Sequence, residues 1–290
     1  MLIPIGYLVV LLSVFGGFVL AGGHLGPLYQ PFEFLMIGGA GIGAFIAANS
    51  GKAIKASFHI FGRLRRSSRY DKALYLELMA LQYKLLVKIR RDGMLAIESD
   101  IDNPEESTLF NEHPRVLSDP LIMVFLTDYL RLMVSGTMEP MELDELMLHE
   151  IEAFEEEAHI PADAIAKVGD AMPAFGIVAA VMGVVRALSA ADVAPSEMGE
   201  MIAHALVGTF LGILIGYGFV NPLASRVEQQ AKEVEMVMHC MRVTLMASLQ
   251  GYAPQIAVEF GRKALHTEER PGFIELEQYV RGAQAGEGRA

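Results

Sequence analysis

The separation of apolar from charged residues along this chain is the feature that most limits its fold. A helix that crosses a bilayer needs about 20 mostly apolar residues, and the stretch from Met1 to Gly22 provides them without a charged side chain. Three further apolar runs are Phe34 to Asn49, Met172 to Val185 and Met201 to Leu223. The sequence therefore predicts an all-α polytopic membrane protein with four transmembrane helices and a large helical cytoplasmic domain.

The distribution of basic residues predicts the orientation, since cytoplasmic loops carry an excess of Lys and Arg. The turn between the first two runs has neither residue type, whereas the segment after the second run is rich in both. We therefore expect a multi-pass protein with both termini and most of its mass in the cytoplasm. The basic residues after the second run are Lys52, Lys55, Arg63, Arg65, Arg66, Arg69 and Lys72.

This orientation divides the chain into four consecutive parts. The expected parts are transmembrane helices 1 and 2 (1–50), a cytoplasmic helical domain (51–169), transmembrane helices 3 and 4 (170–223), and a cytoplasmic helical extension with a tail (224–290).

Two segments of the expected cytoplasmic domain have helical patterns. In the segment from Lys72 to Asp92, leucine and isoleucine recur at spacings of three and four, and Gly93 is a stop signal. The segment from Pro120 to Ser135 is apolar, but it is short for a span and contains Asp128 and Arg131. It therefore predicts a buried cytoplasmic helix.

Small residues form a stripe along the third apolar run and again along the fourth. The first stripe is Pro173, Gly176, Ala180 and Gly183; the second is Gly208, Gly212 and Gly216, with Thr209 beside it. Such stripes let neighbouring helices approach closely. They could pack against each other, or they could leave room for a helix of another chain.

Ion-carrying proteins need an ionisable group within the membrane, and the four apolar runs contain no deep carboxylate, with His204 near the outer end of the fourth. If ions pass here, we expect another chain to supply the carboxylate. Pro173 and Pro222 lie at similar depth near the cytoplasmic ends of the third and fourth runs, and Asp170 is close to the first of them. Since proline permits a bend in a helix, this pair predicts a hinge.

Composition excludes several other classes of protein. The formal net charge of -12 argues against nucleic-acid binding, which requires a basic surface. The single cysteine, Cys240, excludes an internal disulfide, and the sequence has no nucleotide loop, nucleophile elbow or zinc-binding spacing. We therefore expect neither an enzyme nor a metal or cofactor site.

Several longer segments together resemble the MotA family of flagellar stator subunits, within the MotA/TolQ/ExbB proton channel group. The resemblance extends to about residue 281. The similar segments are "GAGIG" (39–43), "GKAIK" (51–55), "VGDAMPAFGIVAAVMGVV" (168–185), "HALVGTFLGILIGYGF" (204–219) and "GYAPQIAVEFGRK" (251–263).

The resemblance implies a bacterial inner-membrane complex in which five copies of the chain surround two copies of MotB. It implies that the single span of MotB supplies the ion-carrying aspartate and that the cytoplasmic domains push on the rotor protein FliG. Pro173 and Pro222 match the paired prolines that couple ion flow to movement. Arg90 and Glu98, in "KIRRDGMLAIESDI", match the charged pair that engages FliG.

The resemblance also indicates the transported ion and the residues near its path, which are Gly176, Ala180, Thr209 and Asp170. Sodium-driven relatives tend to carry threonine at the position of Ala180, so this chain favours protons over sodium. Asp170 and Glu150 match acidic family positions, which either act on protons or shape the assembly.

Three other functions remain open at this point. An energiser of the ExbB or TolQ kind would use the same physics, but the four spans and the long loop count against it. A secondary transporter would show repeats and intramembrane charge. A passive membrane scaffold would leave the paired prolines and the charged loop without a role.

Overall fold

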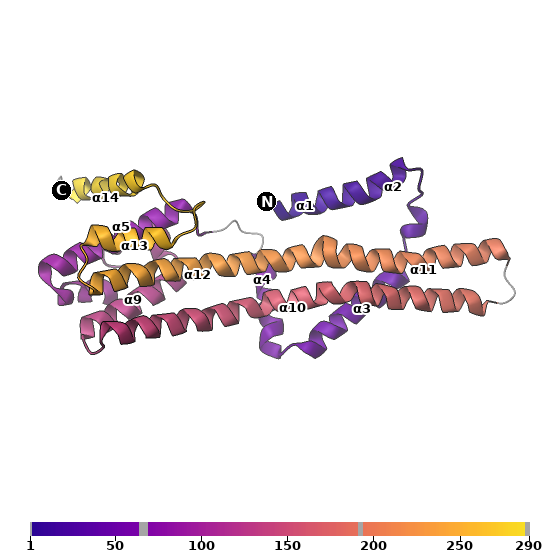
Figure 1. Ribbon diagram of the computed structural model, residues 1–290, viewed down its shortest axis with the longest axis horizontal. Helices are drawn as coiled ribbons and strands as arrows, with labels where there is room; N and C mark the ends of the chain where they lie inside the picture. The colour runs from indigo at the N-terminus through magenta and orange to yellow at the C-terminus, as the bar shows by residue number, and fades with distance from the viewer. Residues whose placement is uncertain (1, 64–68, 191–193, 288–290) are drawn as a thin grey trace. The chain divides into compact units, whose positions relative to one another are not determined.

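The computed structural model describes residues 2–63, 69–190 and 194–287, and every regular element in these ranges is a helix. Arg65 and Arg66, which the orientation prediction used, lie outside the described residues. The chain forms two compact units (Figure 1). Unit 1 comprises residues 1–67 and 158–229, and unit 2 comprises residues 68–157 and 230–290.

The helices of unit 1 include the stretches long and apolar enough to cross a membrane, and four such candidates lie in the described ranges. The elements of unit 1 are α1 (Leu2–Leu11), the π-helical turn η1 (Leu12–Gly16), α2 (Gly17–Leu20), η2 (Gly26–Leu28), α3 (Pro31–Ala48), α4 (Gly51–Arg63), the C-terminal part of α10 (Pro140–Ser189), α11 (Pro195–Ile215), the π-helical turn η4 (Gly216–Val220) and the start of α12 (Asn221–Leu249).

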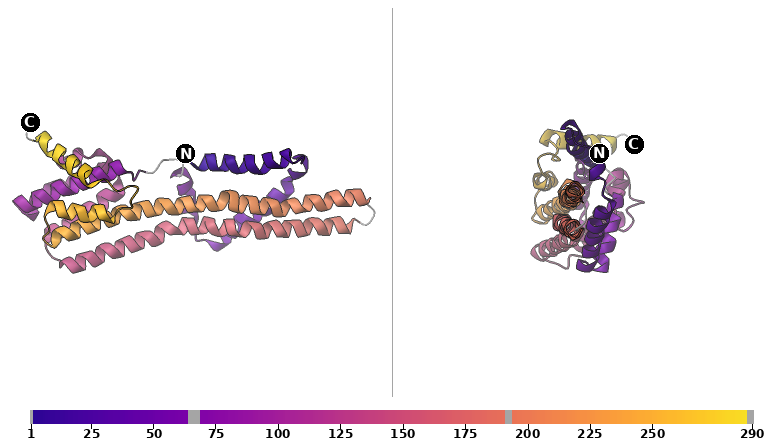
Figure 2. Two further views of the ribbon diagram at one scale, coloured as in Figure 1. Left: turned by 45° about the horizontal axis from the view of Figure 1, so that its top comes forward. Right: turned by 90° about the vertical axis from the view of Figure 1, so that its right-hand side faces the viewer.

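The first span contacts the rest of unit 1 through a few aromatic residues. The Tyr7 hydroxyl donates a hydrogen bond of 2.7 Å to the Phe219 carbonyl oxygen, and the two rings lie 4.9 Å apart. The Phe15 ring meets the Phe210 ring edge-on. Figure 2 shows α1 running alongside α11 and η4. Since no residue of α1 or α2 is buried within the chain, this span faces lipid or other chains.

Unit 2 is built around α5 (Lys72–Asp92), which is buried along most of its length. Asp71 caps its start, because the Asp71 carboxylate accepts a hydrogen bond from the Leu74 backbone N–H. Gly93 ends it with φ of +88°, a conformation that favours glycine. The remaining elements are η3 (Met94–Ile97), α6 (Glu98–Asp102), α7 (Thr108–Asn111), α8 (Pro114–Leu117), α9 (Pro120–Ser135), the N-terminal part of α10, most of α12, α13 (Pro254–Ala264) and α14 (Phe273–Glu287).

The two helices expected between spans two and three are confirmed with the bounds that the sequence predicted. Helix α9 is a core element, since Phe125, Leu126 and Leu130 are almost completely buried. The helical extension after the fourth span is present as well, because α12 continues from η4 to Leu249.

The compact units do not follow the expected domain boundaries at 51, 170 and 224. Helix α10 runs without interruption for 50 residues, so the third span is one part of a longer helix. Residues 51–63 and 158–169 belong to unit 1. There, Ile60 of α4 packs against an apolar cluster formed by Ala162 and Ile165 of α10 with Ala224 and Val227 of α12. The structure thus places a cluster of apolar contacts where the sequence predicted the start of the cytoplasmic domain.

Candidate functional site: the helix crossing of unit 1 and the charged turn of unit 2

Helices α10 and α11 of unit 1 pack together through glycine. A methyl group added to Gly176 would lie 2.7 Å from the Gly208 carbonyl oxygen and 3.3 Å from the Thr209 Cα. One added to Gly212 would lie 2.6 Å from the Met172 carbonyl oxygen and 2.9 Å from the Gly176 Cα. The two backbones therefore touch, as small residues allow in membrane helices.

The stripes of small residues are filled within the chain. Gly183 faces Ala205, and Ala180 is buried beside Gly208. Of the two uses that the sequence left open, the structure shows close packing between α10 and α11. The large apolar side chains Val178, Val181 and Met182 on another face of α10 are more than half exposed.

A carboxyl group lies at this crossing, just outside the four apolar runs in which the sequence showed no deep carboxylate. Glu33, in the first turn of α3, is only 8% exposed and belongs to a candidate span, Gly26–Ala48. Its Oε2 atom is 2.7 Å from the position that a Cβ atom of Gly208 would take. This residue was not considered from the sequence, because the second apolar run was taken to begin at Phe34, one residue after this glutamate.

The two expected hinge residues lie at opposite ends of the π-helical turn η4 in unit 1. A Cβ atom on Gly216, the first residue of η4, would be 3.3 Å from the Pro173 Cδ. Pro222 follows η4 as the second residue of α12. Because proline has no N–H group to donate to the carbonyl four residues earlier, the π-helical turn lies where the helical ladder must be interrupted.

Asp170 and Asn221 connect the same two helices. The Asn221 side-chain amide donates a hydrogen bond of 2.7 Å to the Asp170 carboxylate. Asn221 directly precedes Pro222, and Asp170 lies three residues before Pro173. The carboxylate of Asp170 thus has a role in joining α10 to α12, which the sequence left open.

Arg90 and Glu98 lie at the two ends of one short turn of unit 2. Arg90 is in the last turn of α5, Glu98 begins α6, and η3 lies between them. Both side chains are exposed, and neither has an ion pair with another described residue. Charged residues nearby do form ion pairs: the Lys88 ammonium is 2.6 Å from the Asp100 carboxylate.

An apolar side chain lies between these two charges. Leu95 of η3 is 70% exposed, whereas Ile97 of the same turn is completely buried. The turn therefore presents a cation, an apolar group and an anion, and neither charge has an ion pair within the described part of the chain.

Glu150, the other acidic position singled out from the sequence, has an internal partner in unit 2. The Tyr129 hydroxyl donates a hydrogen bond of 2.6 Å to the Glu150 carboxylate. Burial and this hydrogen bond raise the pKa of Tyr129. The Glu150 carboxylate thus connects α9 to α10, which favours a role in shaping the protein.

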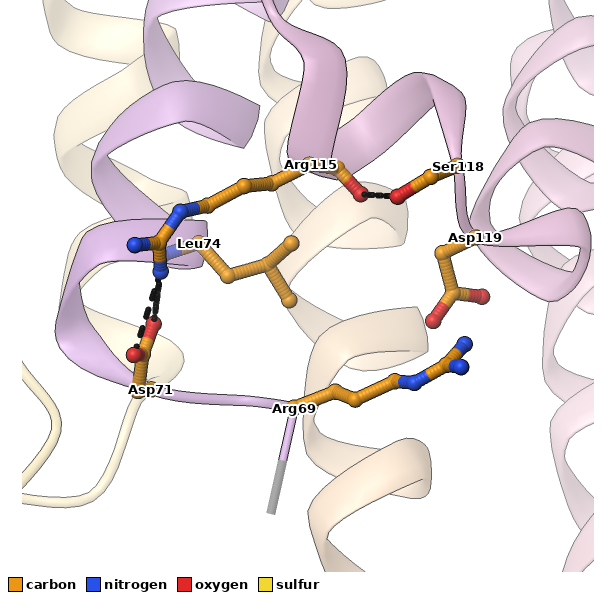
Figure 3. A pocket seen from close by; sticks show the side chains of 6 residues that line it. All are labelled: Arg69, Asp71, Leu74, Arg115, Ser118 and Asp119. Carbon is orange, nitrogen blue, oxygen red and sulfur yellow. Dashed lines mark hydrogen bonds and ion pairs between the residues drawn. The ribbon is translucent and has the colours of Figure 1, made fainter. Parts of the chain in front are cut away.

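A pocket of about 340 Å³ in unit 2 is shown in Figure 3. The Arg115 guanidinium is 3.1 Å from the Asp71 carboxylate, and Asp119 accepts hydrogen bonds from two backbone N–H groups at the start of α9. Arg69 extends toward Asp119 (Figure 3). Both acids thus cap helices, and two positive charges offset two negative ones, so the pocket lacks the excess charge that would select an ion.

Comparison with known proteins identifies the family. Residues 4–93 match the family model "Motility protein A N-terminal", and residues 118–240 match the "MotA/TolQ/ExbB proton channel family". Motility protein A of Salmonella typhimurium and that of Escherichia coli are each 55% identical over 284 residues, which cover 98% of this chain and 96% of the relative. The chain belongs to the motility protein A family.

A solved structure agrees with this assignment. The chain resembles a chain of the flagellar MotAB stator complex from Bacillus subtilis with a TM-score of 0.72 and 26% identity, over 88% of this chain and 92% of that one. The second family model is shared with TolQ and ExbB, but the first is specific to motility protein A. The energiser, transporter and scaffold alternatives are therefore not supported.

Membership in the motility protein A family gives the described sites a common context. Gly176 and Ala180 of α10 lie at the crossing with Gly208 and Thr209 of α11, whereas Asp170 contacts Asn221 at the start of α12. Glu33 was not among the residues predicted from the sequence, although its spacing of four from Ile37 and of eight from Gly41 is typical of one helix face. All three lie on the buried face of α3.

Proposed function

We propose that this chain is the ring-forming stator subunit of a bacterial flagellar motor, and that it conducts protons together with MotB and applies torque to FliG. The observation that carries the proposal is the 55% identity to motility protein A over nearly the full length of both chains. In this proposal five copies surround two copies of MotB in the inner membrane, and unit 2 lies in the cytoplasm.

The proposed energy source is the membrane potential. A proton that crosses about 150 mV releases roughly 3.5 kcal/mol, at ~2.3 kcal/mol per 100 mV. This is enough to bias a conformational step strongly. We assign the proton rather than sodium because Ala180 adds no oxygen at the helix crossing, whereas a sodium ion needs several oxygen ligands.

The proposed coupling uses the paired prolines. Pro173 and Pro222 interrupt hydrogen bonding in α10 and at the start of α12, and the hydrogen bond from Asn221 to Asp170 joins the two helices near these points. Protonation of the MotB aspartate would shift α10 and α12 together because this bond links them.

The proposed rotor contact is the turn that carries Arg90 and Glu98. Exposed charges without internal partners contribute little to stability, and they favour a brief, repeated contact, because complementary charge accelerates encounter without requiring high affinity. The support from the structure is that both charges are exposed and unused by the described part of the chain.

Proton uptake into vesicles tests this function. Vesicles would hold this chain with a MotB that lacks its plug, and the matched control would carry MotB with its membrane aspartate replaced by asparagine. We expect uptake only when both chains and the aspartate are present. Equal uptake by this chain alone would overturn the proposal, since the chain would then carry its own complete path.

A further inference from the structure

Glu33 occupies a position where the packing of unit 1 calls for an apolar residue. Glu33, Ile37 and Gly41 are the buried residues of α3, each four positions apart, and they form one face of the helix. Ile37 packs in a cluster with Met172, Ala179, Val207 and Leu211. A carboxyl group thus takes the third place on an otherwise apolar, buried face.

The carboxyl group of Glu33 points at the crossing of α10 and α11. A Cβ atom on Gly208 would lie 2.7 Å from Glu33 Oε2, 3.2 Å from the Ala179 Cβ and 3.3 Å from the Ala180 backbone nitrogen. The absence of a side chain at Gly208 provides the space for this oxygen. Glu33 therefore lies beside the residues that the sequence analysis placed at the ion path.

The Glu33 Oε2 atom is fully enclosed, and it has no hydrogen-bond partner in the described ranges. The titratable or charged groups on the elements packed around it include His204, Glu197 and Glu200 of α11, Asp170 and Arg186 in the C-terminal part of α10, and His24 and Tyr29 beside η2. The described residues include no hydrogen bond or ion pair from any of them to Glu33.

A carboxylate without a partner is strongly disfavoured in such surroundings, whereas a neutral carboxylic acid is tolerated. A sodium ion would not resolve this, because the atoms nearest to a Cβ position on Gly208 are Oε2 itself, the Ala179 methyl group and the Ala180 backbone nitrogen, which add no further oxygen ligand there. Hard cations bind through several oxygen ligands. A proton satisfies the site with one O–H bond.

We propose that Glu33 is a second proton-binding residue of the stator, carried by this chain at the α10 and α11 crossing. The assignment rests on the proposed function, since it places Glu33 on the same proton path as the MotB aspartate. In the forward step a hydronium ion transfers its proton to the Glu33 carboxylate and becomes water. The O–H bond then breaks, and the proton passes to a water molecule on the way to the aspartate.

Infrared spectroscopy of the complete complex tests the proton binding. Carbon-13 labelled glutamate shifts the carbonyl band of a protonated glutamic acid, and near pH 7 exposed carboxyl groups are ionised and do not contribute to it. We expect a label-sensitive band in the wild type that Glu33→Gln removes and Glu150→Gln leaves. In Glu33→Asp the band should respond to labelled aspartate instead of labelled glutamate. This second variant still tests the proposal if Glu33→Gln does not assemble.

Proton uptake by the same vesicles tests the role in transport. We expect Glu33→Gln to reduce the initial rate roughly a hundredfold or more, the smaller end of the effect of a positioned proton-transfer group. Gly208→Ala should also reduce the rate, since its methyl group would take the space of the carboxyl oxygen while leaving Glu33 in the chain.

Two results would overturn the inference and leave the proposed function intact. The first is a Glu33→Gln variant whose infrared bands and proton uptake equal those of the wild type, while its uptake still requires the MotB aspartate. The other is a Glu33 band that changes with sodium at fixed pH, which would make the site a sodium site. Uptake that does not depend on the MotB aspartate would instead remove the proposed function.

Discussion

The side-chain amide of Asn221 donates a hydrogen bond of 2.7 Å to the carboxylate of Asp170, and this bond joins α12 to α10 beside Pro222 and Pro173. Each of these two helices lacks a backbone hydrogen bond at its proline. The bond from Asn221 to Asp170 connects the helices near those positions. The bond is exposed, so its strength depends on its surroundings.

Removing this hydrogen bond should lower the thermal stability of the chain only slightly, whereas it should clearly reduce the swimming speed of the cells. We expect Asn221→Ala and Asp170→Ala each to lower the free energy of unfolding by about 1 kcal/mol. The double variant should lose little more than either single variant, because both remove the same interaction. Thermal melting of the purified complex and tracking of swimming cells measure the two effects.

Gly169→Ala provides an independent check on the same bond. Its methyl group would overlap the Asn221 side chain, so we expect it to displace the amide and reproduce the swimming defect. Fully additive losses in the double variant, or normal swimming by all of these variants, would contradict the proposed coupling.

A methyl group at the crossing of α10 and α11 should destabilise unit 1. In Gly176→Ala and Gly212→Ala the added carbon would meet backbone atoms within 3.0 Å, which cannot move aside as a side chain can. We expect a loss of about 1–3 kcal/mol for each, typical of overpacked cores. The melting temperature of the purified chain in detergent measures it.

Gly199→Ala is the matched control for this prediction. Gly199 lies on the same helix α11, and a methyl group there would meet nothing within 4 Å. It should melt at or above the wild-type temperature, since alanine favours a helix by up to about 1 kcal/mol over glycine. Equal melting temperatures of Gly176→Ala and Gly199→Ala would show that α10 and α11 are not closely packed at Gly176.

Sequence patterns predicted a helix well where its own residues contain the signals for its start and its end. Helix α5 has a regular apolar repeat and stops at Gly93, whose positive φ a glycine allows. The helical spacing could have shown that Glu33 lies on the buried face of α3. It could not have shown the space beside Gly208 that the carboxyl oxygen fills, because Gly208 is on a helix far away in the sequence. The bond from Asn221 to Asp170 likewise joins residues that only folding brings together.

His113 should make unit 2 sensitive to mild acid. The side chain is 2% exposed and neither ring nitrogen has a hydrogen-bond partner among the described residues. Burial, with a smaller effect of the nearby Lys84 ammonium, lowers the pKa of His113 to about 4, while Glu112 acts in the opposite direction. The folded protein therefore binds fewer protons than the unfolded chain, whose histidine pKa is about 6.5.

Stability that comes from this neutral histidine is fully present above about pH 6.5 and is lost as the pH falls toward 4. Circular dichroism melts of the purified chain should show this decline, and His113→Leu should make it shallower. The control is His266→Leu at an exposed position. A decline of the same slope in His113→Leu would mean that other groups cause it.

Reversing the charges on the turn of unit 2 should reduce torque without unfolding the protein. We expect Arg90→Glu and Glu98→Lys to slow the motor, because both groups are exposed and lack ion pairs with other described residues. Each substitution opposes a helix dipole, at the last turn of α5 or the first of α6, and costs less than about 1 kcal/mol in stability. Motor torque is measured from the rotation of a bead on a flagellar stub.

The exposed residue Lys263 on α13 supplies the matched control, since Lys263→Glu makes a comparable charge reversal away from this turn. If the turn meets the rotor, Lys263→Glu should keep wild-type torque, and an opposite charge reversal on FliG should restore torque to Arg90→Glu. Raising the salt concentration should weaken binding of isolated FliG to the wild-type complex more than to Arg90→Glu, because screening acts on the charge attraction that the variant has already lost. Equal torque losses in Arg90→Glu and Lys263→Glu would show that overall charge, and not this turn, governs the contact.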